Sequence, residues 1–429
     1  MRVHFTTLGC KVNQYETQIL AQLFSHNGFD VTDSPDGADV YVVNSCTVTA
    51  TGDKKTRQSI RKMKREHPGA LVVLTGCYPQ AFPEEAAGIT EADVITGSYN
   101  RKSIFPALQK AMATGERVVD ITPHAKGEAF EPMSASSFME RTRAFVKIED
   151  GCDRYCSYCI IPTARGPIRS KPLQELKTEL SALAQNCYKE VVLVGINLSS
   201  YGRDLGCRLI DAVELACSID GVKRVRLGSL EPELLTGDDI RRMAAQPKFC
   251  PQFHLSLQSG CDETLRRMNR HYDSAEYLRI VGDLRAHFPN CAITTDVMVG
   301  FPGETEEEFA ASLDFVQRVE LAKAHVFAYS IRPGTRAASM DGQIPAKVKE
   351  ERSHQMMAAA AKTRKAFLDR QNGLIEQVLF ETGHHGVYEG YTKNYTPVRV
   401  SSPISLQGSL HLVEIGGNDG ETCEGKLLE

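Results

Sequence analysis

Short runs of β-branched residues alternate with amphipathic stretches along this 429-residue chain, and they do so in two separate series. In the first series, residues 3–9, 39–45 and 70–76 have the composition of short strands. Residues 14–28 have the spacing of an amphipathic helix that ends at Gly28. Such alternation is typical of a parallel sheet covered by helices. We therefore predict an α/β fold with an open parallel-sheet domain over residues 1–112.

The second series follows a stretch rich in glycine, proline and serine, residues 113–137, which predicts an irregular linker. Six strand-like runs separated by helical stretches indicate a partial (βα)6 barrel over residues 138–369, with its site at the carboxyl ends of the strands. The predicted strands cover residues 144–149, 191–196, 224–228, 253–258, 292–300 and 324–330.

The last segment, residues 370–429, has a different sequence pattern. Its short apolar runs at 376–381, 397–402 and 409–415 are broken by glycine and asparagine. That pattern and the segment's length predict a small, OB-like β-barrel.

Composition excludes several classes of protein. Fifty basic and fifty-four acidic residues give a net charge of −4, so bulk charge favours neither nucleic acid nor a membrane surface. No apolar run reaches the ~18 residues that span a bilayer, and the first residues lack a signal-peptide pattern. We therefore expect a cytoplasmic protein with no membrane partner. In that reducing compartment the thirteen cysteines indicate metal binding, catalysis or burial before disulfides.

Three cysteines share one loop, in the spacing CxxxCxxC after the first strand of the predicted barrel. A zinc site needs a fourth ligand, which is not found nearby in the sequence, and a disulfide would use two of the three. Three thiolates on a tight loop suit three irons of a four-iron cluster and leave the fourth open to a ligand. These three cysteines are Cys152, Cys156 and Cys159.

A second trio lies far apart in sequence, just past the ends of the three N-terminal strands. Carboxyl ends of parallel strands share one edge of a sheet, so these cysteines are predicted to converge. For any one of them, the alternative is an ordinary buried apolar residue. This strand-end trio comprises Cys10, Cys46 and Cys77. The other seven cysteines show no ligand spacing, and we predict that they serve packing.

The loop GCDRYCSYC, with an aromatic residue before its last cysteine, resembles the radical S-adenosylmethionine superfamily. The resemblance implies that Cys152, Cys156 and Cys159, called the radical-loop trio from here on, are catalytic. The trio holds a [4Fe-4S] cluster whose open iron binds S-adenosylmethionine. One electron from the cluster then cleaves the sulfonium, and the resulting 5′-deoxyadenosyl radical abstracts a hydrogen atom from the substrate.

The wider pattern resembles the methylthiotransferases over the whole chain, with TLGCKVNQYE at the start, GCDRYCSYCIIPTARG in the middle and a small β-domain, called TRAM, at the end. By this resemblance the strand-end trio binds an auxiliary [4Fe-4S] cluster. LGCKVNQYE and NYTPVRV look most like the branch that acts on N6-threonylcarbamoyladenosine at position 37 of tRNA. The implied reaction places a methylthio group on adenine C2 and uses two S-adenosylmethionine molecules.

The same resemblance implies partners. These are the anticodon stem-loop of tRNA and an external electron donor such as flavodoxin or ferredoxin, while the sulfur donor is undetermined. Three alternatives stay open. They are methylthiolation of a ribosomal-protein aspartate, methylthiolation of isopentenyladenosine in tRNA, and a non-catalytic RNA-binding module held by zinc.

S-adenosylmethionine is a zwitterion joined to an adenosine, and it needs polar groups at several strand ends. Ordinary turn chemistry would explain many of the same residues, and a single arginine is more often solvated than paired. The predicted cosubstrate-binding residues are Tyr158, Gly195, Asn197, Ser229, Glu231, Gln258, Arg270, Asp296 and Gly300.

Two segments bear on RNA. Residues 54–65 hold seven basic residues and no acid, which indicates either a phosphate-contacting helix or a solvated helix face. Residues 371–429 hold three basic and eight acidic residues, so RNA contact there must be local. We predict that such contact involves aromatic stacking and comes from Tyr391, Lys393, Asn394, Tyr395 and Arg399.

Overall fold

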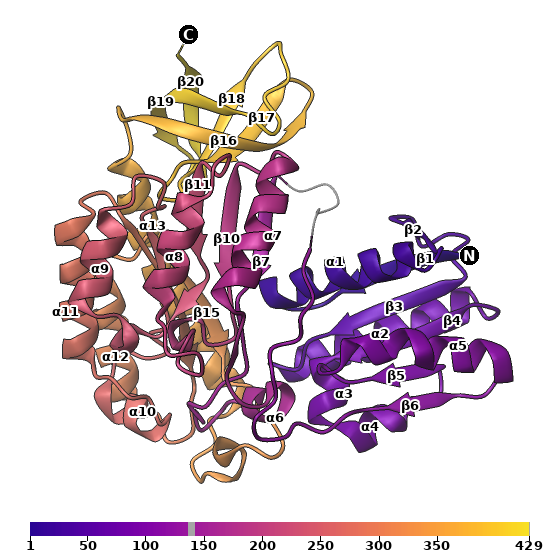
Figure 1. Ribbon diagram of the computed structural model, residues 1–429. Helices are drawn as coiled ribbons and strands as arrows, with labels where there is room; N and C mark the ends of the chain where they lie inside the picture. Colours follow the sequence, from indigo (N-terminus) through magenta and orange to yellow (C-terminus); the bar gives the residue numbers. More distant parts are fainter. Residues whose placement is uncertain (136–141, 429) are drawn as a thin grey trace.

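The structure is a computed structural model, and it describes residues 1–135 and 142–428. Three bodies follow one another along the chain, as Figure 1 shows: an N-terminal sheet with helices, a central strand-and-helix body, and a C-terminal barrel. The predicted boundary between the linker and the central domain, at 137–138, lies outside the described residues.

The N-terminal sheet is parallel and has the strand order β2-β1-β3-β4-β5-β6. Apolar clusters cover both of its faces. Its strands are β1 (Arg2–Thr7), β2 (Asp30–Thr32), β3 (Val40–Ser45), β4 (Leu71–Gly76), β5 (Val94–Thr96) and β6 (Val118–Asp120). Its helices are α1 (Lys11–His26), α2 (Ala50–Glu66), α3 (Cys77–Ala81), α4 (Pro83–Ala87) and α5 (Ile104–Thr114), with the short η1 (Arg101–Ser103).

Two expectations for this domain need correction. β6 lies inside the segment 113–137 predicted as a linker, because a partly exposed three-residue edge strand has too little apolar pattern to reveal itself. The first helix begins at Lys11, three residues before the predicted start, with Cys10 as its N-cap. Cys10 therefore lies at the junction of the first strand's loop and the helix.

All six predicted strands of the central domain are present and run parallel. They are β7 (Arg143–Lys147), β10 (Glu190–Val194), β11 (Arg224–Leu227), β13 (Gln252–Leu255), β14 (Ala292–Val299) and β15 (Lys323–Ala328). After β11, the chain passes through Gly228 into β12 (Ser229–Leu230) and changes partner from β10 to β13. The change divides the partial barrel into two sheets that share one curved wall.

Helices cover the outer side of this wall (Figure 1). They are α7 (Leu173–Gln185), α8 (Leu209–Ser218), α9 (Gly237–Ala244), α10 (Asp262–Arg267), α11 (Ser274–His287), α12 (Glu306–Val319) and α13 (Ala346–Asp369). The shorter elements are α6 (Ile161–Arg165), η2 (Leu198–Ser200), η3 (Pro232–Leu234) and η4 (Arg336–Ser339), and the antiparallel pair β8 (Glu149–Asp150) and β9 (Arg169–Ser170).

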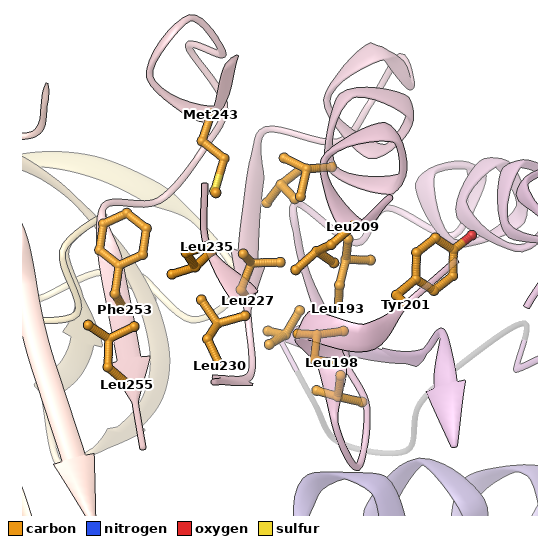
Figure 2. Packing of buried hydrophobic residues seen from close by; sticks show 14 of the residues in the cluster. Leu193, Leu198, Tyr201, Leu209, Leu227, Leu230, Leu235, Met243, Phe253 and Leu255 are labelled. Atoms are coloured by element: carbon orange, nitrogen blue, oxygen red, sulfur yellow. The ribbon is translucent and has the colours of Figure 1, made fainter. Parts of the chain in front are cut away.

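Apolar side chains of strands and helices form one continuous core between the two layers. Figure 2 shows Leu193, Leu227 and Leu255 of three strands meeting Leu209 and Met243 of the covering helices. This packing fixes the strand ends, and the loops that carry the polar residues begin at those ends.

The C-terminal segment is a closed barrel, as predicted, with the order β16-β17-β18-β20-β19. Its strands are β16 (Ile375–His384), β17 (Val387–Tyr391), β18 (Pro397–Ser401), β19 (Leu410–Asn418) and β20 (Cys423–Leu427). Two buried arginines of β11 attach it to the central domain: Arg224 donates to the carbonyl of Tyr391 at 2.9 Å, and Arg226 donates to that of Lys393 at 3.0 Å. The barrel therefore lies at the amino ends of the central strands.

Among the residues that the structure describes, no helix combines the length and the apolar character that crossing a bilayer requires.

Candidate active site

The radical-loop trio lies between β8 and α6, past the carboxyl end of β7. The loop is held by its own backbone, since the amide of Cys159 donates to the carbonyl of Cys156 at 2.9 Å and that of Cys152 donates to Gly166 at 3.1 Å. Burial raises the pKa of the Cys152 thiol, and it raises that of Cys159 to about 12. These thiols stay protonated at neutral pH until a cation binds them as thiolates.

Arg270 ties this loop to the opposite wall of the site. Its Nη1 lies 3.2 Å from the Sγ of Cys156 and 3.5 Å from the hydroxyl of Tyr158, and its Nη2 is paired with Glu231. A single arginine is more often solvated, but the structure buries the side chain of this predicted cosubstrate-binding residue beside a cysteine sulfur.

Gly195 and Asn197 follow the second strand and contact a buried carboxyl group. The amide of Asn197 donates to Oε2 of Glu149 at 2.7 Å, and a Cβ at Gly195 would lie 2.6 Å from the same oxygen. Burial raises the pKa of Glu149 well above its usual value. Oε1 of Glu149 and Oδ1 of Asn197 are buried with no hydrogen-bond partner among the described residues. A polar ligand held here would satisfy both atoms.

The fourth and fifth strands bring the remaining predicted residues to the same wall. Gln258 has a φ of +65°, and its amide donates to the carbonyl of Asp296 at 2.9 Å. Gly300 has a φ of +70°, and its amide donates to the buried Glu304 carboxylate at 2.7 Å. Ser229 is exposed on β12 and faces a cavity.

The strand-end trio follows β1, β3 and β4, and the structure brings its members together. Cys46 and Cys77 come directly after β3 and β4. Gly9 has a φ of +115°, and a Cβ there would lie 3.1 Å from the Sγ of Cys46, so the loop that carries Cys10 passes against that sulfur. Burial raises the pKa of the Cys77 thiol to about 12, and the neighbouring thiols of Cys46 and Cys10 add to the rise.

Arg165 connects the two trios. It ends helix α6, which follows the radical loop, and its side chain is fully buried. Its Nε lies 3.1 Å from the Sγ of Cys77, while its other nitrogens donate to Asn13 at 2.6 Å and Glu16 at 2.5 Å. Burial alone would raise the pKa of Glu16, but Arg101, Arg165 and Lys147 lower it to about 2. The carboxylate is therefore charged and paired.

A cavity of about 780 Å³ extends from the strand ends at Gly195 and Ser229 to the C-terminal barrel. It is lined by alternate residues of the central strands, by the loop that carries Cys10, and by the chain around Tyr391 and Tyr395. Of the predicted site residues, it touches Cys10, Gly195, Ser229 and Asp296. This volume suits a nucleoside-sized ligand.

The chemistry of the two donor sets fits iron–sulfur clusters. Each set consists of thiols with buried arginine beside one sulfur, and thiolate is the ligand that such clusters take. Within the described part of the chain, no three His, Cys, Asp or Glu side chains are placed to hold one metal ion. An iron–sulfur cluster needs a different arrangement of ligands from a single metal ion, because each cysteine binds a separate iron.

One of the residues predicted for RNA contact is placed differently from expectation. Asn394 is buried and donates to the carbonyl of Asn290 at 3.0 Å, so it serves the interface between domains. Tyr391 and Tyr395 stack on each other at 4.4 Å, beneath Arg143. In the basic segment, Ile60 and Met63 of α2 are buried, and Arg61 and Lys64 pair with Glu91 and Asp93.

Sequence reasoning missed the buried polar residues Asn13, Glu16, Glu149 and Arg165. Charged residues lie at the surface by default, and nothing local marks one as buried. Polar residues of the cavity did leave a signal, because they alternate along β14 and β15 at Thr294 and Asp296 and at Lys323 and His325. Period-two spacing on a strand places such residues on one face.

Known proteins resemble the chain in each of these parts. Residues 2–97 match the family model described as Uncharacterized protein family UPF0004, and residues 146–316 match that of the Radical SAM superfamily. The threonylcarbamoyladenosine tRNA methylthiotransferase MtaB of Bacillus subtilis (strain 168) is 36% identical over 422 residues, covering 96% of this chain and 93% of the relative. The tRNA-2-methylthio-N(6)-dimethylallyladenosine synthase of Symbiobacterium thermophilum is 33% identical over 100% of this chain and 94% of the relative.

One solved structure with a similar fold is the radical S-adenosylmethionine methyltransferase TsrM of Kitasatospora setae, with cobalamin and a [4Fe-4S] cluster bound. It has a TM-score of 0.56 and 13% identity, over 90% of this chain and 77% of the other. Its likeness concerns the fold alone. From the near full-length identity to the curated relatives, the chain belongs to the tRNA methylthiotransferase family of radical S-adenosylmethionine enzymes.

Proposed function

We propose that the chain places a methylthio group on C2 of adenine in N6-threonylcarbamoyladenosine at position 37 of tRNA. The observation that carries the proposal is the pair of cysteine trios, which Arg165 joins and which lie at the carboxyl edges of two sheets. The MtaB relative is named for this nucleoside and is more similar than the relative named for dimethylallyladenosine.

The radical-loop trio would hold one [4Fe-4S] cluster and the strand-end trio a second. When bound, the clusters and S-adenosylmethionine supply the reducing electron, the hydrogen-abstracting radical, the sulfur and the methyl group. The protein's own contribution is positioning. Its buried arginines, Arg165 and Arg270, place a positive charge beside one sulfur of each trio, which stabilises thiolates in a buried setting.

The second strand provides a polar seat for the cosubstrate. Oε1 of Glu149 and Oδ1 of Asn197 would accept hydrogen bonds from it, and Gly195 has no side chain between those atoms and the cavity. Burial raises the pKa of Glu149, which favours its protonated form, and a protonated carboxyl group can also donate a hydrogen bond. In that form the seat would orient the cosubstrate without adding a negative charge to the site.

The substrate defines the partners. The tRNA would present its anticodon stem-loop to the cavity, and an external donor such as flavodoxin or ferredoxin would deliver electrons. We place the enzyme in the cytoplasm, because its substrate is found there and because free thiols persist in that reducing compartment.

Nucleoside mass spectrometry of tRNA from a deletion strain tests the substrate. We expect the methylthio form of threonylcarbamoyladenosine to disappear and the unmodified precursor to accumulate. An unchanged level would refute the proposal. Loss of methylthio-isopentenyladenosine, or of a methylthiolated ribosomal-protein aspartate, would instead support the alternatives. Zinc without iron in the anaerobically purified protein would support the non-catalytic reading.

A further inference from the structure

The cavity has a cationic wall. Lys11 follows Cys10 and begins helix α1, and Lys323 begins strand β15. Both side chains are exposed, and both residues line the cavity. His325 lies on the same strand as Lys323 and is also in contact with the cavity; burial and both lysines lower its pKa, and Asp296 raises it. Two residues 312 positions apart in sequence thus act on one region of the cavity.

Neither ammonium group has an acidic partner within the described residues. Burial lowers the pKa of Lys11 to about 8, and Arg143 and Arg226 add to the fall, while Glu190, which opposes it, is already bonded to Arg226 at 2.8 Å. Asp296 and Glu421 also line the cavity, and Asp296 lies 3.5 Å from His254. Neither carboxylate forms an ion pair with Lys11 or Lys323 among the described residues, so both ammonium groups can bind an anionic ligand.

The other residues that line the cavity indicate which chemical group the ligand carries beside its anionic group. Phe327 lies on the same face of β15 as Lys323, and 49% of its surface is exposed. Phe327 is four positions along the strand from Lys323, which is a span of roughly 13 Å. An exposed aromatic ring offers a stacking surface for a base. A planar apolar surface and a cationic wall in one cavity match a base that carries an anionic substituent.

We propose that Lys11 and Lys323 form a carboxylate subsite that reads the threonine carboxylate of the N6-threonylcarbamoyl group. This proposal rests on the proposed function and deepens it. The carboxylate is several bonds away from C2, so a subsite for it belongs beside the reacting atom and not at it. A dimethylallyl group has no charge to offer and would leave the ammonium groups unpaired, which disfavours that substrate.

A phosphate of the RNA backbone carries the same type of charge, so the test must separate the two sources. The test uses three anticodon stem-loop RNAs as ligands. One carries threonylcarbamoyladenosine, one carries the same nucleoside with its carboxylate converted to a carboxamide, and one carries plain adenosine. Their dissociation constants are measured anaerobically with the full-length, cluster-loaded protein at one salt concentration, for the wild type, Lys11→Gln and Lys323→Gln. Lys54→Gln, on an exposed part of α2, is the matched control.

We expect the wild type to bind the acid RNA at least tenfold more tightly than the carboxamide RNA. Each glutamine variant at the subsite should reduce this ratio toward one, while its affinity for the carboxamide RNA stays within about threefold. Lys54→Gln should weaken all three RNAs alike and keep the ratio. A ratio that survives both subsite variants would overturn the proposal. An equal loss for all RNAs would also overturn it, because that is the signature of a phosphate contact.

Two further measurements distinguish a failure of the carboxylate subsite from a disturbed cluster and from a failure of the proposed function. The iron content of Lys11→Gln shows whether the change disturbs the neighbouring Cys10, and Lys323 is distant from all six cysteines in sequence, so its variant decides the matter independently. Formation of methylthio product by the wild type from the acid RNA tests the proposed function itself. If product forms while the binding ratio is one throughout, the subsite fails and the function stands.

Discussion

The Nε of Arg165 lies 3.1 Å from the Sγ of Cys77. Arg165 belongs to the helix that follows the radical loop, whereas Cys77 follows a strand of the N-terminal sheet. The guanidinium therefore helps to hold the helix after the radical loop against the strand-end trio. Its remaining bonds to Asn13 and Glu16 anchor it in the N-terminal domain, where no water reaches it.

Replacing Arg165 by Met should destabilise the protein strongly. The change leaves Glu16 with two of its three cationic partners and removes the bond to Asn13, and breaking a buried ion pair costs about 3–5 kcal/mol. Denaturant unfolding of the cluster-free protein measures the loss. Arg208→Met is the control, because Arg208 forms exposed ion pairs worth up to ~1 kcal/mol. Equal losses for the two variants would contradict the structural role of Arg165.

The two trios should be separable by mutation. Cys152→Ala is expected to lower the iron content from about eight to about four per chain and to abolish 5′-deoxyadenosine formation. Cys77→Ala should lower iron by the same amount but leave 5′-deoxyadenosine formation in place, with no methylthio product. Iron analysis and chromatography of the products measure both effects. Cys187, an exposed cysteine, is the control, and its alanine variant should match the wild type.

Glu149 should make stability depend on pH. Burial raises its pKa in the folded protein above the usual 4.5. Between 4.5 and the folded pKa, unfolding releases a proton, so the free energy of unfolding falls as pH rises, by up to about 1.4 kcal/mol per pH unit. Glu149→Gln keeps an acceptor for the amide of Asn197 and removes the titration.

The variant should therefore gain stability relative to the wild type as pH rises from 5 to 8. Unfolding midpoints of the cluster-free proteins across this range provide the measurement. The exposed Glu116→Gln serves as control. Parallel curves for the wild type and Glu149→Gln would show that the carboxyl group is already ionised in the folded state.

The sequence predicted the parts of the fold that repeat a pattern. All six central strands and the three long N-terminal strands contain short runs of apolar or β-branched residues, and the C-terminal barrel has glycine-broken strands. The errors were at short or unmarked elements: β6 has three residues, and the start of α1 was placed too late because its N-cap, Cys10, is not one of the residues that usually mark a helix start. Elements with a clear sequence pattern were therefore predicted, and elements too short to show one were not.

For the site, the sequence predicted where the cysteines lie relative to the strands, but it did not predict which side chains contact them. The strand ends placed Cys46 and Cys77 correctly, because parallel strands share an edge. The bond from Arg165 to Cys77 joins residues 88 apart in different domains, and no local signal encodes it. The same holds for Asn394, which has the composition of a surface loop residue and is buried against Asn290. Tertiary packing alone decides such contacts.

Helix α2 gives a prediction about tRNA affinity. Lys54 and Lys55 are exposed and have no acidic partner among the described residues, whereas Arg61 on the same helix lies 3.1 Å from Glu91. A lysine that contacts phosphate releases a counterion, so each replacement by glutamine should reduce the slope of log affinity against log salt by about 0.7–0.9. The slope is measured by fluorescence anisotropy with tRNA at salt concentrations from about 50 to about 300 mM, where this effect is large.

Arg61→Gln is the matched control on this helix. Its guanidinium is already paired with Glu91, so its removal should change the slope by less than either lysine variant does. Because the acidic C-terminal barrel offers little general attraction for RNA, the basic helix should dominate the salt dependence. If all three variants kept the wild-type slope, α2 would be a solvated face, and the tRNA would approach the cavity from another side.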